Sequence, residues 1–201
     1  MSTTFPARVL RLLLGLVLFG VSIALMVRAD LGLPSWDVLH QGLSQRLGLP
    51  FGWVVNAVAL AVLLLWIPLR QRPGVGTIAN VVLVGFSADA ALAVLPVVDN
   101  LAARAALLLT GVLLNGMATG LYIGAGLGPG PRDGLMTGLA ERGHSIRAAR
   151  TAIELTVLAV GWLLGGTVGV GTLLYAVAIG PVAQFFIPRL AVPVPSPARA
   201  T

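Results

Sequence analysis

Long apolar stretches alternate with short polar ones along the whole chain. The stretch Ala57–Ile67 contains no polar side chain other than the indole of a tryptophan, unlike the alternating strands of a membrane β-barrel. A helix that crosses a bilayer needs about 20 mostly apolar residues. The pattern therefore predicts an all-α integral membrane protein with six transmembrane helices, and we expect them at 9–27, 51–69, 76–95, 102–124, 149–166 and 171–188.

Composition supports a single membrane domain over residues 1–201. Hydrophobic residues make up 57% of the chain and charged residues only 10%, whereas soluble domains carry about 25% charged residues. The mean hydropathy is +0.96. Too few charges are present to cover a surface that faces water, so we expect the lipid bilayer to be the protein's environment.

The net charge of +6 comes from 13 arginines against seven acidic residues, and their distribution explains the high pI. With a cytoplasmic N-terminus, only Arg28, Arg46 and Arg104 fall outside, and the other ten lie in or near cytoplasmic segments. This is the positive-inside bias of inner-membrane proteins. It predicts a bacterial inner-membrane protein with both termini in the cytoplasm, and it makes nucleic-acid binding an unnecessary explanation of the charge.

Residues for common catalytic chemistry are scarce. The chain has no cysteine and two histidines, His40 and His144, too few for most zinc sites. No hydrolase, zinc-protease or phosphate-loop motif occurs. We therefore expect no metal, no cofactor and no enzymatic activity.

An internal repeat organises the chain. When the sequence is aligned with itself at a shift of 96 positions, 12 of the 32 residues from 15 to 46 are identical to their counterparts, including Asp37 with Asp133. At a shift of 95, the segment GVGT at 74–77 aligns with an identical segment at 169–172. The repeats span 9–96 and 102–190, and the proline-rich tail 191–201 is expected to be disordered. The apolar segment near the N-terminus could also be a signal peptide, but its counterpart in the second repeat argues against removal.

Each repeat contains three predicted spans, so successive repeats enter the membrane from opposite sides. Such inverted repeats are typical of secondary transporters, which bind substrate near the midplane between the repeats. A repeat kept only for helix packing is the alternative interpretation.

A short glycine- and proline-led helix is predicted after the first span of each repeat, in 29–46 and 125–142. Both segments are too short to cross the bilayer, so we expect re-entrant or interfacial helices. Interrupted segments at matching positions indicate a transporter's binding site, although the aspartates could simply cap helices, as Ser35 could. The candidate substrate-binding residues are Gly32, Pro34, Ser35, Trp36, Asp37, Gly128, Pro131, Arg132 and Asp133.

Polar residues inside the spans are candidates for ion coupling, because ionisable groups are costly at membrane depth. The candidates are Asp89, Asn115 and Glu154. Interhelical hydrogen bonding, or an ion pair between Arg150 and Glu154 one helical turn apart, would explain them without transport. The repeated small residues, such as Gly116 and Gly120, are expected to pack helices closely.

The segments ADLGLPSWDVLHQGLS, LWIPLRQRPGVGTIANVVLVG and AGLGPGPRDGLMTGLAER resemble the YczE/YitT-like bacterial membrane proteins. The resemblance covers nearly the whole chain except the tail. It implies a small multi-pass inner-membrane protein from a group in which some members are linked to peptide-antibiotic production and suspected of transport. Arg132 stands where the first repeat has Trp36, so a shared site would be asymmetric.

The sequence thus favours a secondary transporter or permease for a small metabolite, with Arg132 as the partner if that metabolite is an anion. A non-transporting assembly or scaffold protein and a substrate-capture subunit of a larger uptake complex are the alternatives. Homo-oligomer formation remains open.

Overall fold

The structure is a computed structural model that describes residues 4–143 and 145–192. Within these residues every regular element is a helix, which confirms the all-α prediction. The helices are α1 (Phe5–Ala29), α2 (Ser35–Leu47), α3 (Phe51–Leu64), α4 (Trp66–Leu69), α5 (Val75–Val94), α6 (Leu101–Gly124), α7 (Pro131–Ala140), α8 (Ile146–Leu163) and α9 (Val170–Leu190).

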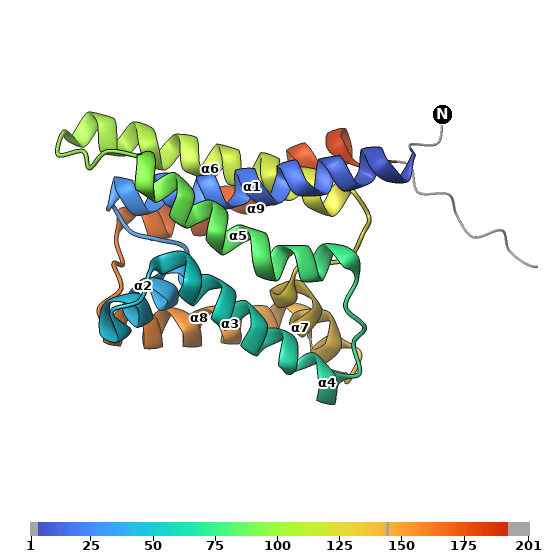
Figure 1. Ribbon diagram of the computed structural model, residues 1–201. Helices are drawn as coiled ribbons and strands as arrows, with labels where there is room; N and C mark the ends of the chain where they lie inside the picture. Colours follow the sequence, from blue (N-terminus) through green and yellow to red (C-terminus); the bar gives the residue numbers. More distant parts are fainter. Residues whose placement is uncertain (1–3, 144, 193–201) are drawn as a thin grey trace, which may run out of the picture.

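The helices form two layers (Figure 1). One layer contains the long helices α1, α5, α6 and α9, and the other contains α2, α3, α4, α7 and α8. Within the second layer, α2 packs on α8 and α7 packs on α3, so each short helix contacts the opposite half of the chain. The packing of α3 on α5 joins the layers on one side.

Small residues allow α1 and α6 to pack closely in an antiparallel arrangement. A Cβ atom added at Gly15 would lie 2.8 Å from the backbone nitrogen of Tyr122, and one added at Gly111 would lie 2.7 Å from Cγ of Met26. Neither position has room for a larger side chain. The predicted role of the glycines in close helix packing therefore holds at this contact.

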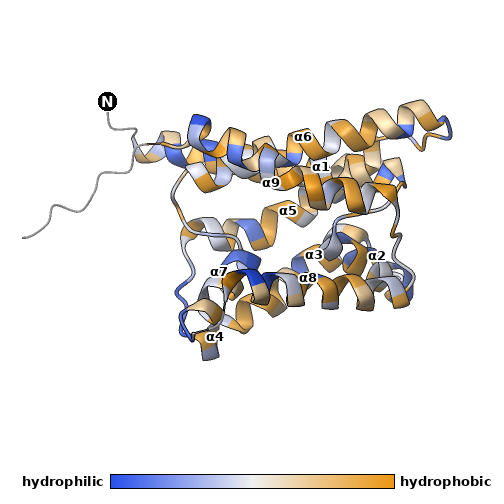
Figure 2. Cartoon of the chain, turned by 180° about the vertical axis from the view of Figure 1, so that it is seen from behind, coloured by the Kyte–Doolittle hydropathy of each residue, from blue (hydrophilic) through white to orange (hydrophobic). Residues whose placement is uncertain are grey.

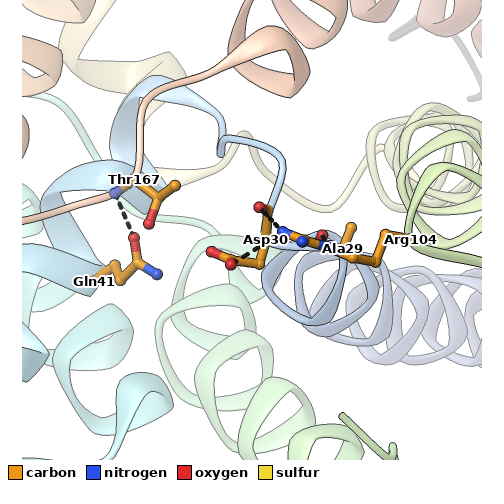
Figure 3. Close-up of polar contacts among 5 residues, drawn as sticks. All are labelled: Ala29, Asp30, Gln41, Arg104 and Thr167. Carbon is orange, nitrogen blue, oxygen red and sulfur yellow. Dashed lines mark hydrogen bonds and ion pairs between the residues drawn. The ribbon is translucent and has the colours of Figure 1, made fainter. Parts of the chain in front are cut away.

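The ends of α1 and α6 are joined by two equivalent arginine contacts. Nε of Arg104 donates to the carbonyl oxygen of Ala29 at 2.7 Å, and the same guanidinium contacts Asp30 (Figure 3). At the other end, Nε of Arg8 donates to the carbonyl oxygen of Ala125 at 2.8 Å. Each residue in the second contact lies 96 positions from its counterpart in the first.

Two further hydrogen bonds cross between the halves of the chain. The carbonyl oxygen of Leu31, before α2, accepts from the backbone nitrogen of Gly171 at 2.7 Å. The carbonyl oxygen of Leu127, before α7, accepts from the backbone nitrogen of Gly76 at 2.8 Å. The loop before each short helix therefore contacts the start of the last helix of the other half.

Five segments are long and apolar enough to cross a membrane: α1, α3 with α4, α5, α6 and α9. The predicted span 149–166 overlaps α8, which does not belong to this group because it carries Arg147, Arg150 and Glu154. Figure 2 shows mainly hydrophobic helices, with hydrophilic segments at several helix ends and in α7. The protein is thus a multi-pass membrane protein with five candidate spans by this criterion.

The helix bounds differ from the predictions by a few residues, with one internal exception. The stretch 51–69 is interrupted at Leu65, where α3 ends, and α4 continues from Trp66. The indole Nε1 of Trp66 donates to the carbonyl oxygen of Pro131 at 2.9 Å, so this break brings α4 onto the start of α7. Most of the predicted tail 191–201 lies outside the described residues.

Candidate functional site

A cavity of about 590 Å³ lies between the two layers. Residues from both halves of the chain form its wall, including the starts of α2 and α7. Seven of the nine predicted binding residues contribute to that wall: Pro34, Ser35, Trp36, Asp37, Pro131, Arg132 and Asp133. The structure therefore brings the two short segments, 96 residues apart, to one place.

The remaining two predicted residues, Gly32 and Gly128, support the cavity from the loops behind it. Their φ angles are +109° and +125°, a region that residues with a Cβ atom rarely adopt. An added Cβ at Gly32 would lie 2.5 Å from the backbone nitrogen of Gly169, and one at Gly128 would lie 3.0 Å from Cα of Gly74. These glycines are required by the backbone rather than by a ligand.

Arg132, in the first turn of α7, places a positive charge at the cavity. Its guanidinium carbon lies 4.7 Å from the ring centroid of Trp36 on α2, a cation–π contact. Within the described part of the chain, the guanidinium has no hydrogen bond and no ion pair. The arginine charge is therefore held in position by an aromatic ring and is not neutralised by a paired carboxylate.

Asp133 follows Arg132 and stabilises the start of α7. Its Oδ2 atom accepts from the backbone nitrogen of Gly130 at 3.3 Å and from the hydroxyl of Tyr122 at 3.0 Å. This is the capping contact expected from the sequence. The hydroxyl contact also fixes α7, and with it Arg132, against α6.

Asp37 has a different role from its repeat partner. Its carboxylate does not cap α2, because the N-cap residue of this helix is Pro34. Ser35, which the sequence suggested as the cap, is instead the first residue of the helix and makes no capping hydrogen bond. A proline and a serine already inside the helix leave no side-chain cap at this end. Oδ1 of Asp37 instead lies 3.0 Å from Nδ1 of His40, and only 3% of Asp37 is exposed.

His40 is the residue that sequence reasoning missed as a site residue, because the chain's two histidines gave no metal-site pattern. The side chain is fully buried and meets the ring of Phe51 edge-on at 6.1 Å. Since a carboxylate can only accept, the Nδ1–H group donates to Asp37, and the free acceptor of the neutral ring is Nε2. Nε2 has no partner among the described residues. The i,i+3 spacing from Asp37 was the available signal.

Burial lowers the pKa of the His40 imidazole below its ordinary value. The hydrogen bond with Asp37 opposes this effect, whereas the nearby positive charge of Arg132 adds to it. The protonation state of His40 therefore depends on two residues of the cavity wall.

The candidate coupling residues lie in different surroundings. Asn115 lines the cavity and donates to Oγ of Ser22 at 2.8 Å, and it accepts from the hydroxyl of Tyr175 at 2.9 Å. Glu154 also lines the cavity and forms the expected ion pair with Arg150 at 3.0 Å. Both residues are thus part of the site's polar wall.

Asp89 does not reach the cavity. Its Oδ1 accepts from the backbone nitrogen of Gly52 at 2.6 Å, and Oδ1 of Asn56 accepts from the backbone nitrogen of Gly85 at 2.9 Å. Both bonds lie at the α3–α5 contact, where a Cβ on Gly52 or Gly85 would overlap the carbonyl oxygen of the other glycine. Asp89 therefore holds α3 against α5.

The equivalent helices of the second half, α8 and α9, do not pack on each other as α3 and α5 do. A second cavity of about 350 Å³ lies between them and shares wall residues with the first, including Arg150, Glu154 and Thr172. The repeat aligns Gly180 with Gly85, and an added Cβ at Gly180 would have no neighbour within 4 Å. The central cavity thus adjoins the cavity between α8 and α9, and the two share wall residues.

Comparison with known proteins gives relatives without an assigned activity. An uncharacterised protein of Haemophilus influenzae is 40% identical over 177 residues, covering 88% of this chain and 81% of that protein. The uncharacterised membrane protein YczE of Bacillus subtilis is 36% identical over 173 residues, covering 85% and 80%. The uncharacterised protein YyaS of Bacillus subtilis is 25% identical over 182 residues, covering 87% and 90%.

No solved structure matches the chain. Residues 6–188 match the model of a family of unknown function, DUF6198, so the similarity extends from α1 to the last turns of α9. This range includes every wall residue of the cavity between the layers. The chain belongs to the DUF6198 family of unknown function and is related to the membrane protein YczE.

Proposed function

We propose that the protein is a secondary transporter that moves a small anion through the cavity between its two halves. The guanidinium group of Arg132 carries this proposal. It faces a cavity of about 590 Å³, stacks on Trp36, and has no carboxylate partner among the described residues. Arg132 is half-buried, so its charge is only partly solvated by water, and a bound anion would supply a partner for it.

The other charged groups of the wall favour this assignment. Glu154 is paired with Arg150 at 3.0 Å, and Asp133 already accepts two hydrogen bonds. Both carboxylates thus already have partners, whereas the guanidinium of Arg132 has none among the described residues. Arg132 can bind an anion and lose only part of its stacking on Trp36.

The equivalent contacts of the two halves support an inverted repeat. The Arg8 and Arg104 contacts are related by 96 positions, and they join opposite ends of the antiparallel helices α1 and α6. A two-fold axis in the membrane plane would produce such contacts. In this arrangement α8 completes a set of six spans, and two of its charged residues, Arg150 and Glu154, line the cavity.

An inverted repeat also supplies a transport cycle. In the present structure α3 and α5 are in contact, while α8 and α9 are separated by the second cavity. If the halves exchange these conformations, the α8–α9 opening closes and the α3–α5 contact opens. The cavity would then be accessible from alternate sides of the membrane.

The arginines support an inner-membrane location with cytoplasmic termini. Arg11, near the N-terminus, donates to the carbonyl oxygen of Leu190 at 3.2 Å, so the two ends of the described chain lie together. Arg8, Arg142 and Arg189 belong to the same arginine-rich set of segments. Under the positive-inside rule this end faces the cytoplasm.

The proposal is tested by uptake into proteoliposomes that contain the purified protein. The panel includes radiolabelled phosphate, lactate, succinate and glutamate, with glycerol and choline as neutral and cationic comparisons. We expect uptake of at least one anion, and Arg132→Gln should abolish it while Arg72→Gln, a change at an exposed loop arginine, leaves it unchanged. Folding of each variant is checked by its melting temperature.

Uptake that survives in Arg132→Gln, or equal loss for neutral and anionic compounds, would contradict the anion assignment. If folded protein transports nothing, a scaffold role is favoured. Co-purification of a stable partner, with uptake only in the complex, would favour a substrate-capture subunit.

A further inference from the structure

We propose that Asp37 and His40 form a proton-binding site that couples anion transport to proton movement, with Arg132 linking the proton to the anion. This inference rests on the proposed transport function. It assigns the protein to proton–anion symporters, in which one bound species increases the affinity for the other.

The geometry provides a proton acceptor beside the cavity. Asp37 belongs to the cavity wall, and its Oδ1 lies 3.0 Å from Nδ1 of the fully buried His40. Because Nδ1–H donates to the carboxylate, Nε2 carries a free lone pair, and it has no partner among the described residues. A proton that binds Nε2 converts the pair to an imidazolium–carboxylate ion pair without breaking the existing hydrogen bond.

The other carboxylates near the cavity are less suited to this role. Glu154 is already paired with Arg150, and Asp133 is held by Gly130 and Tyr122. Asp89, one of the coupling candidates from the sequence, is outside the cavity wall and bound to the backbone of α3. Asp37 is the wall carboxylate whose partner is itself titratable near neutral pH.

The charged and titratable groups around the pair come from several elements. They are Arg132 and Asp133 on α7, Arg150 and Glu154 on α8, Tyr122 on α6 and Tyr175 on α9. The helix α3, which also packs on α2, has no titratable residue. Two of these six groups, Arg150 and Glu154, neutralise each other, and Asp133 is a partial counter-charge to its neighbour Arg132.

Arg132 supplies the coupling between the two bound species. Its positive charge opposes protonation of His40. An anion bound to the guanidinium would compensate this charge and favour the protonated pair. By linkage, protonation must then raise the affinity for the anion by the same factor. A proton and an anion would therefore bind and leave together.

The pair exists in only one half of the chain. The repeat aligns Asp37 with Asp133 and His40 with Met136, which also lines the cavity. One histidine in one half predicts a single proton site for each cavity. His40→Met is therefore an informative substitution, because it gives the first half the methionine that the second half has at the equivalent position, Met136.

The first test follows His40 directly and requires no known substrate. In the full chain with His144→Gln, His40 is the remaining histidine, and ¹⁵N-histidine NMR in nanodiscs reports its protonation between about pH 4 and about pH 9. We expect a protonation step that moves to lower pH in Asp37→Asn and to higher pH in Arg132→Gln. A ring that stays neutral throughout, or a midpoint unchanged by both substitutions, would overturn the proton site.

The second test separates coupling from transport, using whichever anion of the uptake panel is taken up. His40→Met should lose accumulation driven by a pH gradient but retain exchange of labelled for unlabelled anion across equal pH. In the parent protein, the anion should bind about 5- to 150-fold more tightly at acid than at alkaline pH, the usual range of such coupling. Gradient-driven accumulation that survives in His40→Met would contradict the proposal.

The two tests also distinguish the two levels of inference. If no panel anion is taken up but His40 responds to Asp37→Asn and Arg132→Gln, the transport proposal fails and the proton site remains. If uptake is present but independent of pH in the parent protein, transport stands and the coupling proposal fails.

Discussion

The guanidinium group of Arg104 donates a hydrogen bond of 2.7 Å to the carbonyl oxygen of Ala29. It joins the start of α6 to the end of α1, and Arg8 makes the equivalent bond to Ala125 at 2.8 Å. Both arginines bind the otherwise unsatisfied carbonyl oxygens that end a helix. Arg8 and Arg104 match at the same shift of 96 positions, although they lie before the matched stretch 15–46 on which the repeat was identified.

The two arginines should therefore contribute similarly to stability. Hydrogen bonds from charged groups typically contribute about 1.5–3 kcal/mol, so we expect Arg8→Ala and Arg104→Ala to lower the free energy of unfolding by about that amount each. Arg72→Ala is the matched control. Melting temperatures in detergent provide the measurement, and a loss confined to one of the two arginines would argue against equivalent roles.

A second prediction concerns Gly85 and its repeat partner Gly180. Gly85→Ala should destabilise the protein by about 1–3 kcal/mol, as overpacking does, because the new Cβ overlaps the carbonyl oxygen of Gly52. Gly180→Ala should stay within about 0.5 kcal/mol of the parent, since the position is open. If both alanines have the same effect on unfolding, the difference between the α3–α5 and α8–α9 sides does not exist in solution.

The proposed cycle predicts that this difference reverses during transport. Because the chain has no cysteine, introduced pairs can be cross-linked selectively. The rings of Trp53 and Phe86 meet edge-on across α3 and α5, with their centroids 5.6 Å apart, so we expect Trp53→Cys with Phe86→Cys to cross-link. The pair equivalent by repeat, Ala148→Cys with Pro181→Cys, should cross-link slowly at rest and faster during uptake.

Uptake should also stop when the Trp53→Cys and Phe86→Cys pair is oxidised and return on reduction. Full uptake by the cross-linked protein would show that α3 and α5 need not separate. Each single-cysteine variant serves as the control for effects of the substitutions themselves.

A fourth prediction concerns Asp133. Asp133→Ala removes the N-terminal bond of α7, typically worth about 1 kcal/mol, and leaves the hydroxyl of Tyr122 without its acceptor. Asp133→Asn retains an acceptor oxygen and should remain closer to the parent in stability and in uptake. Direct substrate binding by the Asp133 carboxylate would instead predict loss of transport in this asparagine variant, whereas the observed capping contact predicts a milder effect. Melting temperature and initial uptake rate, measured on the same preparations, decide between these outcomes.

Much of the fold follows from local sequence features. Continuous apolar runs predicted the helices, and glycines such as Gly15 and Gly111 predicted close contacts because small residues let helices approach. The break at Leu65 was not predictable, since residues on both sides are apolar. It becomes understandable only from the contact of Trp66 with Pro131, which is 65 positions away.

The candidate site was predictable in part for a similar reason. The repeat indicated that 29–46 and 125–142 are equivalent, and both segments contribute to one cavity wall. It could not show that Asp133 caps its helix whereas Asp37 bonds to His40, because identical residues at equivalent positions acquire different partners in three dimensions. The opening between α8 and α9 depends on packing that no local pattern encodes.

The exchange of contacts between the halves has a consequence for the origin of the chain. Leu31 accepts a hydrogen bond from Gly171 and Leu127 accepts one from Gly76, so each half supplies a backbone partner to the other. Two copies of a half-length ancestor, inserted in opposite orientations, would form the same contacts as an antiparallel dimer. Gene fusion would then have freed each half to diverge, and the difference between His40 and its repeat counterpart Met136 would be a product of that divergence. Separately expressed halves of the present chain should accordingly reassemble in the membrane.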